Sequence, residues 1–466
     1  MKKLGIILGI ILAILIILFF IFTGQVDRTP FYSTDYFKTT FARIDSLKKL
    51  NVLEDDSIQA GFAKVSITPS LNNPVDNFAE GKFVQIPLAG FGERKGKPAT
   101  GIHDSIFIKA VAMREKQQIL IFIGADLLIM PPNITDSVSE LLAKKGIHRD
   151  QLVFSATHSH SSLGAWGPGF VGEQFAGKEN KNIEKWLVQQ IVKVVTSAIA
   201  DLRPAKIGTG CFNAGIYTHN RLVGKLGTKN DDFAFVEIEQ IGFRKAIIGS
   251  FSAHATTMGA GNMEISADYP GYWERKMEAS SFDLAVFFAG SVGSQSPAGE
   301  GKGFDKPKMI GEALADSLNL HLKKINLNEK VNLSAVSLKI QLPEYHIRLT
   351  TKLNLSTYLS KKLMPFPEHV YLQAIRIGKM IWITAPSDFS GEYALQIKNA
   401  LATKGFEANV SSFNGSYVGY IIPGRYFYLD EYEPKLMGWF GPNMGEYSMN
   451  LIRQISNIVT QTGQND

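Results

Sequence analysis

The chain has 466 residues, of which 45% are hydrophobic, enough for one large domain or two ordinary domains with a real core. Its net charge of +6 comes from 49 basic and 43 acidic residues spread without long runs. This balance excludes a nucleic-acid footprint and is compatible with anionic membrane lipid. The single cysteine, Cys211, excludes a disulfide framework and a cysteine-rich zinc site, so any bound metal must use histidine and oxygen ligands.

The N-terminus carries an uninterrupted apolar run at residues 4–22, "LGIILGIILAILIILFFIF", which follows two lysines. As a helix, this run nearly spans a hydrocarbon core of about 30 Å. It is longer than the apolar region of a usual signal peptide and lacks a small-x-small cleavage site. We therefore predict an uncleaved transmembrane signal-anchor over residues 1–23. Lys2 and Lys3 favour an N-inside orientation, with the remaining chain on the extracytoplasmic side, periplasmic or extracellular.

The next segment, residues 24–57, is predicted to be a stem or linker with a short helix near 36–50, and the main domain is predicted over 58–466. Within that domain, strand-like apolar runs alternate with amphipathic helices, which predicts an α/β fold with mixed β-sheets flanked by helices in a single large domain. The predicted strands are 106–114, 118–126, 151–160, 205–212, 233–241, 245–257, 283–297 and 379–386. The predicted helices are 135–146, 183–204, 308–325 and 391–405.

The stretch "FSATHSHSS" at 154–162 ends a predicted strand with a His-x-His pair. Residues i and i+2 of an extended strand share a face, so His158 and His160 are predicted to project side by side. Paired imidazoles suit a divalent metal, or one metal ligand beside one group that handles substrate. The alternative is two polar residues where a strand frays into a loop.

Polar residues recur just past the ends of apolar strands. Ligand sites in α/β proteins gather at such edges, although ordinary loops also begin with polar residues. The residues in this position are Asp126, His158, His254, Ser296 and Asp388.

Seven short motifs then occur in a fixed order: "SATHSHSSLGA", "HNR", "SAHATTM", "ISADYPGY", "GSVGSQSP", "APSDFSGE" and "SYVGYIIPGRYFYLDEYEP". In this order the chain resembles the neutral/alkaline (non-lysosomal) ceramidase family, in its catalytic N-terminal domain, over residues 60–457. The resemblance implies an amidase that cleaves the N-acyl bond of ceramide with one zinc ion per chain. The product pair would be a sphingoid base and a fatty acid.

The resemblance also implies roles for individual residues. The zinc ligands would be His158, His254, Asp388 and Tyr420. His160 would stabilise the reacting carbonyl and Tyr432 would contact the substrate. Arg221 would act in the site, and Ser296 would hydrogen-bond a substrate hydroxyl. Asp126 and Asp268 would either orient the zinc histidines or cap turns, and these two alternatives stay open.

Three departures from the family pattern bear on specificity. Asp388 stands where the family has glutamate and is shorter by one methylene, about 1.5 Å of reach. Ser294 stands where aspartate is usual, and Ala298 where asparagine is common. The chain also stops soon after "GPNMGEYSMNLIRQ", so no C-terminal immunoglobulin-like domain is expected.

Three hypotheses follow. The first is a membrane-anchored zinc amidohydrolase acting on ceramide or a related N-acyl sphingolipid. The second keeps the zinc chemistry and changes the substrate to another acylated amphiphile. The third is a weakly catalytic lipid-binding paralogue, suggested by the change to Asp388. Nothing in the sequence determines the oligomeric state.

Overall fold

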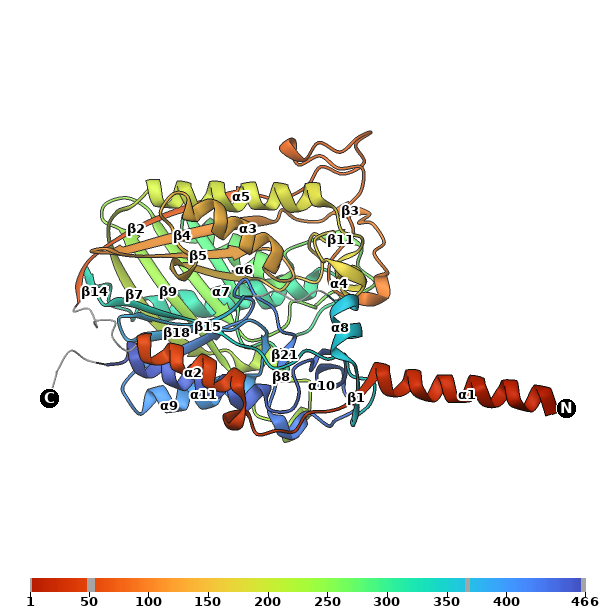
Figure 1. The fold of residues 1–466 in the computed structure, drawn as a ribbon. Coiled ribbons are helices and arrows are strands. Elements are labelled where there is room, and N and C mark those ends of the chain that lie inside the picture. Colours follow the sequence, from red (N-terminus) through yellow and green to blue (C-terminus); the bar gives the residue numbers. More distant parts are fainter. Residues whose placement is uncertain (1, 48–54, 365–368, 462–466) are drawn as a thin grey trace.

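Two β-sheets packed face to face form the centre of the domain, and helices cover the outer face of each (Figure 1). The structure, a computed structural model, describes residues 2–47, 55–364 and 369–461. The shared core between the sheets contains Phe122 and Phe288 from one sheet and Trp382 from the other. The Trp382 ring lies edge-on to both phenylalanine rings, with centroids 6.0 and 5.7 Å away. This arrangement confirms the predicted mixed sheets flanked by helices.

The larger sheet combines antiparallel pairs with two parallel ones, β5 with β6 and β10 with β12. Its strand order is β12-β10-β9-β7-β2-β4-β5-β6, and β14 also pairs with β2. The strands are β2 (Asp56–Ser66), β4 (Phe107–Glu115), β5 (Gln118–Ala125), β6 (Leu152–Ala156), β7 (Arg203–Asn213), β9 (Asp232–Gln240), β10 (Lys245–Phe251), β12 (Leu284–Ala289) and β14 (Lys330–Val331).

The smaller sheet has the order β15-β17-β18-β20. Its strands are β15 (Leu333–Ile340), β17 (Val370–Ile377), β18 (Met380–Thr384) and β20 (Glu407–Ser411). Side chains alternate between the two faces of a strand, which explains the layering. Along β9, for example, Ala234 and Val236 enter the core between the sheets, whereas Phe233 and Phe235 pack under the helices.

Helices on the outer face of the larger sheet are α3 (Pro132–Ala143), α5 (Lys181–Ala200), α6 (Asp268–Ser280) and α7 (Asp305–Leu322). Those on the smaller sheet are α2 (Asp35–Leu47), α9 (Gly391–Ala402) and α11 (Met444–Val459). In α5 the Asn180 side chain accepts a hydrogen bond from Asn182 N at the start of the helix. Ile183, Leu187 and Ile191 then recur every four residues on the buried face.

Shorter elements connect these layers. They are the strand pairs β3 (Gly101–Ile102) with β11 (Glu264–Ile265), β8 (Thr218–Asn220) with β13 (Gln295–Pro297), and β19 (Asp388–Phe389) with β21 (Tyr420–Ile421). The short helices are α4 (Gly169–Ala176), α8 (Thr357–Leu363) and α10 (Tyr432–Met437), with 3-10 turns at Phe31–Ser33, Phe78–Glu80, Gly92–Arg94, Arg149–Gln151, Gly215–Tyr217, Gly224–Leu226 and Gly424–Tyr426.

The N-terminal helix α1 (Lys2–Phe22) projects away from the domain (Figure 1). Among the described residues it is the one helix long and apolar enough to cross a membrane, with a mean hydropathy of 3.4. This criterion rests on length and composition alone, and a signal sequence satisfies it equally. The helix leads directly into β1 (Thr23–Gln25), which pairs with β16 (Leu353–Leu355).

The segment at residues 24–57 was predicted to be a stem, but its helix α2 packs into the domain. Ile44 and Thr40 are fully buried. The Thr40 hydroxyl accepts a hydrogen bond from Gln341 N at 2.8 Å, and the Tyr447 hydroxyl of α11 lies 2.8 Å from it. The helix therefore belongs to the layer over the smaller sheet. The rest of the predicted helix, residues 48–50, lies outside the described residues.

The two ends of the larger sheet approach each other across the core. Gly124 in β5 makes this possible, because a Cβ at this position would lie 2.5 Å from Val286 Cγ1 of β12. β6 lies next to β5, and β10 lies next to β12. The loops that follow β6 and β10 are thereby brought to one place.

Candidate active site

The loops after β6 and β10 hold the three motif histidines together. Ser159 and Ala255 form an isolated parallel bridge, and His160 N donates to Ala255 O at 3.1 Å. The predicted His-x-His pair is close in space, with 3.2 Å between the Nε2 atoms of His158 and His160. The reason given from sequence was wrong. β6 ends at Ala156, and His158 has a φ of 63°, so a turn rather than an extended strand brings the rings together.

Backbone carbonyls orient two of these histidines. His158 Nδ1 lies 2.7 Å from Leu128 O, and His254 Nδ1 lies 3.0 Å from Gln295 O. A carbonyl oxygen only accepts, so each Nδ1 carries a proton and each neutral ring presents a lone pair at Nε2. Burial, together with the neighbouring His254, lowers the pKa of His158 to about 3. Burial also lowers the pKa of His254 far below its ordinary value. Both rings are therefore neutral, the form that binds metal.

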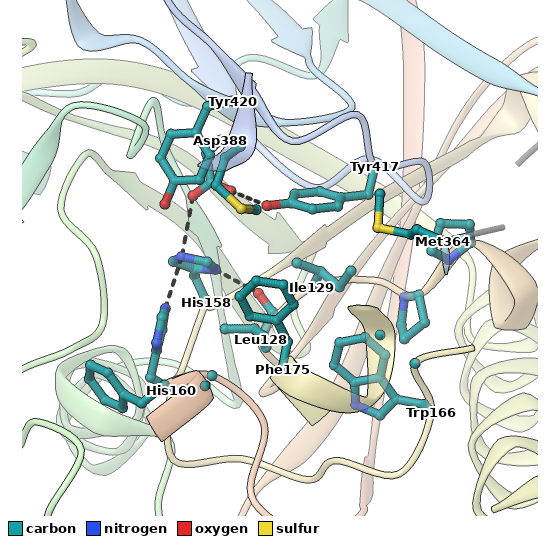
Figure 2. Close-up of a pocket in the computed structure, with 18 of the residues that line it drawn as sticks. Leu128, Ile129, His158, His160, Trp166, Phe175, Met364, Asp388, Tyr417 and Tyr420 are labelled. Atoms are coloured by element: carbon teal, nitrogen blue, oxygen red, sulfur yellow. Dashed lines mark hydrogen bonds and ion pairs between the residues drawn. The ribbon is translucent and has the colours of Figure 1, made fainter. Parts of the chain in front are cut away.

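Two short parallel strands supply oxygen atoms opposite these nitrogens. β19 and β21 pair with Asp388 directly beside Tyr420. Asp388 Oδ1 lies 3.4 Å from His158 Nε2 and 3.2 Å from His254 Nε2. The Tyr420 hydroxyl lies 3.0 Å from His254 Nε2. Tyr417 donates to the other carboxylate oxygen, Asp388 Oδ2, at 2.7 Å (Figure 2).

The chemistry of these atoms fits a divalent cation. Asp388 Oδ1 is buried and has no hydrogen-bond partner among the described residues. It lies opposite the Nε2 atoms of the two neutral imidazoles, which have His160 Nε2, the Tyr420 hydroxyl and Arg221 as neighbouring donors. A cation at this point would give the carboxylate oxygen the partner that it lacks among the described residues. Two imidazole nitrogens with a carboxylate oxygen form a donor set that Zn²⁺ uses in proteins.

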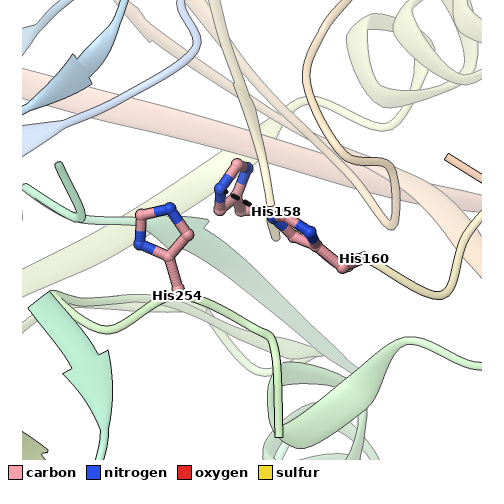
Figure 3. A group of neighbouring side chains, drawn as sticks. All are labelled: His158, His160 and His254. Atoms are coloured by element: carbon pink, nitrogen blue, oxygen red, sulfur yellow. Dashed lines mark hydrogen bonds between the residues drawn. The ribbon is translucent and has the colours of Figure 1, made fainter. Parts of the chain in front are cut away.

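A second donor set overlaps the first. One nitrogen from each of His158, His160 and His254 lies within 4.8 Å of the others (Figure 3). His160 Nδ1 is buried without a hydrogen-bond partner among the described residues, so this ring also has an unused lone pair or proton. Geometry alone therefore leaves His160 as either a third nitrogen ligand or a group beside the metal.

The histidines stand at one end of a cavity of about 690 Å³. In Figure 2, Met364 and Trp166 lie on the opposite side of this cavity from His160. Most of the other lining residues are apolar: Phe91, Leu128, Ile129, Pro131, Pro132, Trp166, Phe175, Met364, Met437 and Trp439. The space suits an amphiphile whose polar end meets the histidines.

Arg221 and Tyr432 line the same cavity, as predicted for site residues. Arg221 donates to the Tyr420 hydroxyl at 2.9 Å and to Glu433 Oε1 at 2.7 Å. Burial alone would lower the pKa of Arg221, but Tyr420 and Glu433 raise it above the ordinary value, so the guanidinium keeps its charge. Burial raises the pKa of Tyr432 to about 12, which keeps its hydroxyl protonated and able to donate.

Ser296 does not line this cavity. It pairs with His219 across the antiparallel β8–β13 ladder. Directly opposite residues share a face of a ladder, and His219 is exposed. The structure therefore does not bring Ser296 to the other predicted site residues. Its neighbour Gln295 is the motif residue that reaches the site, through the carbonyl that orients His254.

The two aspartates with open alternatives both cap backbone turns. Asp126 Oδ2 accepts from Phe107 N at 2.8 Å. Asp268 accepts from Thr257 N at 3.1 Å and from Tyr269 N at 2.6 Å. Backbone carbonyls, not these carboxylates, hold the Nδ1 atoms of His158 and His254.

Two residues that support the site, Arg94 and Gly90, were not identified from the sequence, because neither lies in one of the motifs. Arg94 is 4% exposed, and its guanidinium donates to the His160 carbonyl, to Ala89 O at 3.2 Å and to Asn262 O at 2.8 Å. Gly90 has a φ of 99°, and a Cβ there would lie 2.7 Å from His160 Nδ1. The "GFGER" stretch thus fixes the His160 loop, and only the turn-forming glycines hint at it.

The comparisons with known proteins bear on the family and the fold. Residues 79–221 match the family described as neutral/alkaline non-lysosomal ceramidase, N-terminal. The predicted resemblance to this family is confirmed. The structure of neutral ceramidase from Pseudomonas aeruginosa superposes with a TM-score of 0.73 at 18% identity, covering 87% of this chain and 75% of that one.

A second solved structure, described as ceramidase complexed with C2, gives the same TM-score of 0.73 and 18% identity, covering 86% of this chain and 75% of that one. At this identity the likeness establishes a shared fold. No significant match was found among curated proteins. The family match includes His158, His160 and Arg221, whereas His254, Asp388 and Tyr420 lie outside the matched residues.

Proposed function

We propose that the protein is a zinc-dependent amidohydrolase that cleaves the N-acyl amide bond of ceramide or a related N-acyl sphingolipid. The observation that carries this proposal is the convergence of His158 Nε2, His254 Nε2 and the partnerless Asp388 Oδ1 at the polar end of an apolar cavity. The ceramidase fold and the family match support the choice of substrate class.

In this proposal His158, His254 and Asp388 hold one Zn²⁺, with Tyr420 beside them as the fourth donor. When bound, the ion supplies Lewis-acid polarisation and an activated water at neutral pH. The neutral imidazoles and the carboxylate give a site with net charge close to +1. Tyr417 fixes the unused carboxylate oxygen, so Asp388 presents Oδ1 in one orientation.

The remaining site residues act on the substrate. His160 and Tyr432 line the cavity beside the centre and can donate hydrogen bonds to the developing oxyanion or pass a proton to the leaving amine. Arg221 donates to the Tyr420 hydroxyl and, as a lining residue of the cavity, keeps a positive charge near the position proposed for the reacting carbonyl. The apolar wall from Leu128 to Met364 excludes water and accommodates an acyl chain.

We also propose that α1 is retained as a signal-anchor with the domain on the extracytoplasmic side. The domain then begins before residue 58, because α2 is one of its packed helices. The lysines at positions 2 and 3 and the 0% burial of the apolar span support this assignment.

The test is metal content together with hydrolysis by the purified full chain. We expect one zinc ion per chain and release of fatty acid from N-acyl sphingosines. Dialysis against a chelator should remove both, and added zinc should restore activity. A panel of N-acyl amides and acyl esters separates ceramide from another acylated amphiphile. Absence of stoichiometric zinc with retained lipid binding would instead support a binding paralogue.

A further inference from the structure

The candidate membrane helix is joined to the domain without a linker. α1 ends at Phe22 and β1 begins at the next residue, with Thr23 paired to Leu355 of β16. Ser356 N donates to Phe22 O at 2.8 Å. The last turn of α1 is therefore hydrogen-bonded to the segment that begins α8, and the domain cannot rotate freely about its anchor.

The same end of the domain carries the far wall of the cavity. Met364, directly after α8, lines the cavity, and so do Gly172 and Phe175 of α4. α4 and α8 contact each other. In Figure 1 both helices lie at the end of the domain from which α1 projects. The part of the cavity wall at Met364, which lies opposite His160 in Figure 2, is thus at the anchor end of the domain.

The outer surface of these two helices has the composition of a membrane interface. Phe170 of α4 and Tyr358 of α8 are each 61% exposed, and neither lines the cavity. Lys361 and Lys362 are exposed on α8, and Lys362 Nζ lies 4.8 Å from the Tyr358 ring centroid. Aromatic residues concentrate at the bilayer interface, and lysines nearby attract anionic headgroups.

We propose that α4 and α8 form a docking surface for an anionic lipid bilayer, with Phe170 and Tyr358 inserted at the headgroup boundary. Substrate then passes from the leaflet into the cavity between these helices, beside Met364. We expect a lipid bilayer rather than a protein on this surface, because α1 is connected to the domain through β1 and β16. This fixed connection holds the surface against the membrane. This inference rests on the proposed function for the identity of the substrate and for the retention of α1 as a membrane anchor.

The docking itself is tested without activity. The full chain is reconstituted in nanodiscs of phosphatidylcholine and phosphatidylglycerol, with a benzophenone amino acid replacing Phe170 or Tyr358. After irradiation we expect lipid adducts by mass spectrometry at both positions. Phe243, 58% exposed on the β9–β10 turn, is the matched negative control, and Phe20 within α1 is the positive control. Adducts at Phe20 but not at Phe170 and Tyr358 would overturn the proposal.

Substrate entry is tested by kinetics. We expect Phe170→Asp combined with Tyr358→Asp to lower hydrolysis of a long-chain N-acyl sphingosine in the bilayer at least about tenfold. Hydrolysis of a dispersed short-chain analogue should stay within about twofold, and Phe243→Asp should change neither. Equal loss on both substrates, with an unchanged melting temperature, would contradict entry from the leaflet.

The crosslinking and kinetic experiments distinguish failure of the docking proposal from failure of the hydrolase proposal. If the docking proposal holds and the hydrolase proposal fails, lipid adducts form at Phe170 and Tyr358 although neither substrate is hydrolysed. If only the docking proposal fails, both substrates are hydrolysed and the double variant behaves like the Phe243→Asp control. Replacement of phosphatidylglycerol by phosphatidylcholine should weaken adduct formation, because Lys361 and Lys362 lose their anionic partners.

Discussion

The two sides of the candidate metal centre are built in different ways. The nitrogen side is held by backbone: His158 and His254 each donate from Nδ1 to a main-chain carbonyl, at Leu128 after β5 and at Gln295 in β13. The oxygen side rests on two strands of two residues each, and side chains hold its groups, Tyr417 on Asp388 and Arg221 on Tyr420. Backbone fixes the nitrogen positions, whereas a network of hydroxyls and charges fixes the oxygen positions.

Because of this difference, the two sides of the centre should respond differently to substitutions. The carbonyls of Leu128 and Gln295 remain when a side chain is removed, so the nitrogen side should fail when a histidine is replaced or when the backbone that carries these carbonyls is displaced. The oxygen side combines a buried carboxylate, two phenols and a guanidinium. Burial raises the pKa of Asp388 above its ordinary value, and the neighbouring His158 and Tyr417 oppose that rise. Each member of such a network depends on the others, so several substitutions should weaken it by degrees.

The largest effect should come from the nitrogen side. We expect His158→Ala to abolish zinc binding and to lower hydrolysis more than about 1,000-fold, because a metal ligand is lost. His160→Ala should keep the zinc and lower the rate about 100- to 1,000-fold, as expected for a group that stabilises an oxyanion. Metal analysis and kcat of both variants check this pair.

Zinc loss in the His160 variant would show that His160 is also a zinc ligand. Replacement of Asp388 then shows whether the carboxylate belongs to the same donor set. The His160 and Asp388 variants together therefore decide between the overlapping donor sets.

On the oxygen side, Asp388→Asn should weaken zinc binding more than about 100-fold while the protein stays folded, because the charged ligand becomes a neutral amide. Zinc affinity by competition with a chromophoric chelator measures this change. Asp388→Glu is the matched variant that keeps the charge. It should retain more zinc than the amide variant, and the opposite order would contradict ligation by the carboxylate.

Arg221→Met should lower kcat/KM roughly 10- to 100-fold with zinc retained, because the Tyr420 hydroxyl and Glu433 lose their shared donor. Arg221→Lys keeps the charge but has no planar fork to hold both partners, so it should recover only part of the rate. If Lys restored the full rate, the charge alone would matter and the positioning of Tyr420 would not.

Tyr417→Phe should have a smaller effect, about tenfold on zinc affinity, because it removes only the hydrogen bond to Asp388 Oδ2. The ring stays in place against Trp439, with ring centroids 5.9 Å apart, so the fold should not change. Tyr432→Phe serves as the contrast. It should lower the rate without lowering zinc affinity, since Tyr432 lines the cavity and is proposed to contact substrate rather than to hold Asp388.

Much of the fold could be predicted from the sequence because period-2 and period-3.6 apolar patterns are local signals. The strands from 106 to 251 and helices such as α5 and α9 lie close to their predicted places. Packing against distant residues leaves no such signal. The polar composition of α2 predicts a stem, yet Thr40 is buried and hydrogen-bonded to Gln341 and Tyr447.

In the candidate site, too, local motifs could be predicted from the sequence, whereas contacts between distant residues could not. His158, His160, His254, Asp388 and Tyr420 stand out because their residue types and motif order carry chemistry. Arg94 and Tyr417 act through contacts with residues far along the chain, and the carbonyls of Leu128 and Gln295 belong to the backbone, which the sequence does not mark. Ser296 is the contrast, since its motif predicted a substrate contact, whereas it pairs with the exposed His219 and does not line the cavity.

The smallest effect should therefore come from Ser296→Ala, which we expect to leave kcat/KM within about twofold and the melting temperature unchanged. A serine nucleophile needs a base oriented by a third group, and the neighbour across the ladder, His219, is exposed to solvent. Gln295→Leu is the matched variant on the buried face of the same strand. Its amide donates to Thr218, Asn230 and Ser252, so its loss should cost about 3 kcal/mol of stability and displace His254. Unfolding curves and steady-state kinetics of the two variants give the comparison. An acyl group trapped on Ser296 after rapid quench with substrate, or a large rate loss in Ser296→Ala with normal zinc, would restore a catalytic serine and reverse this order.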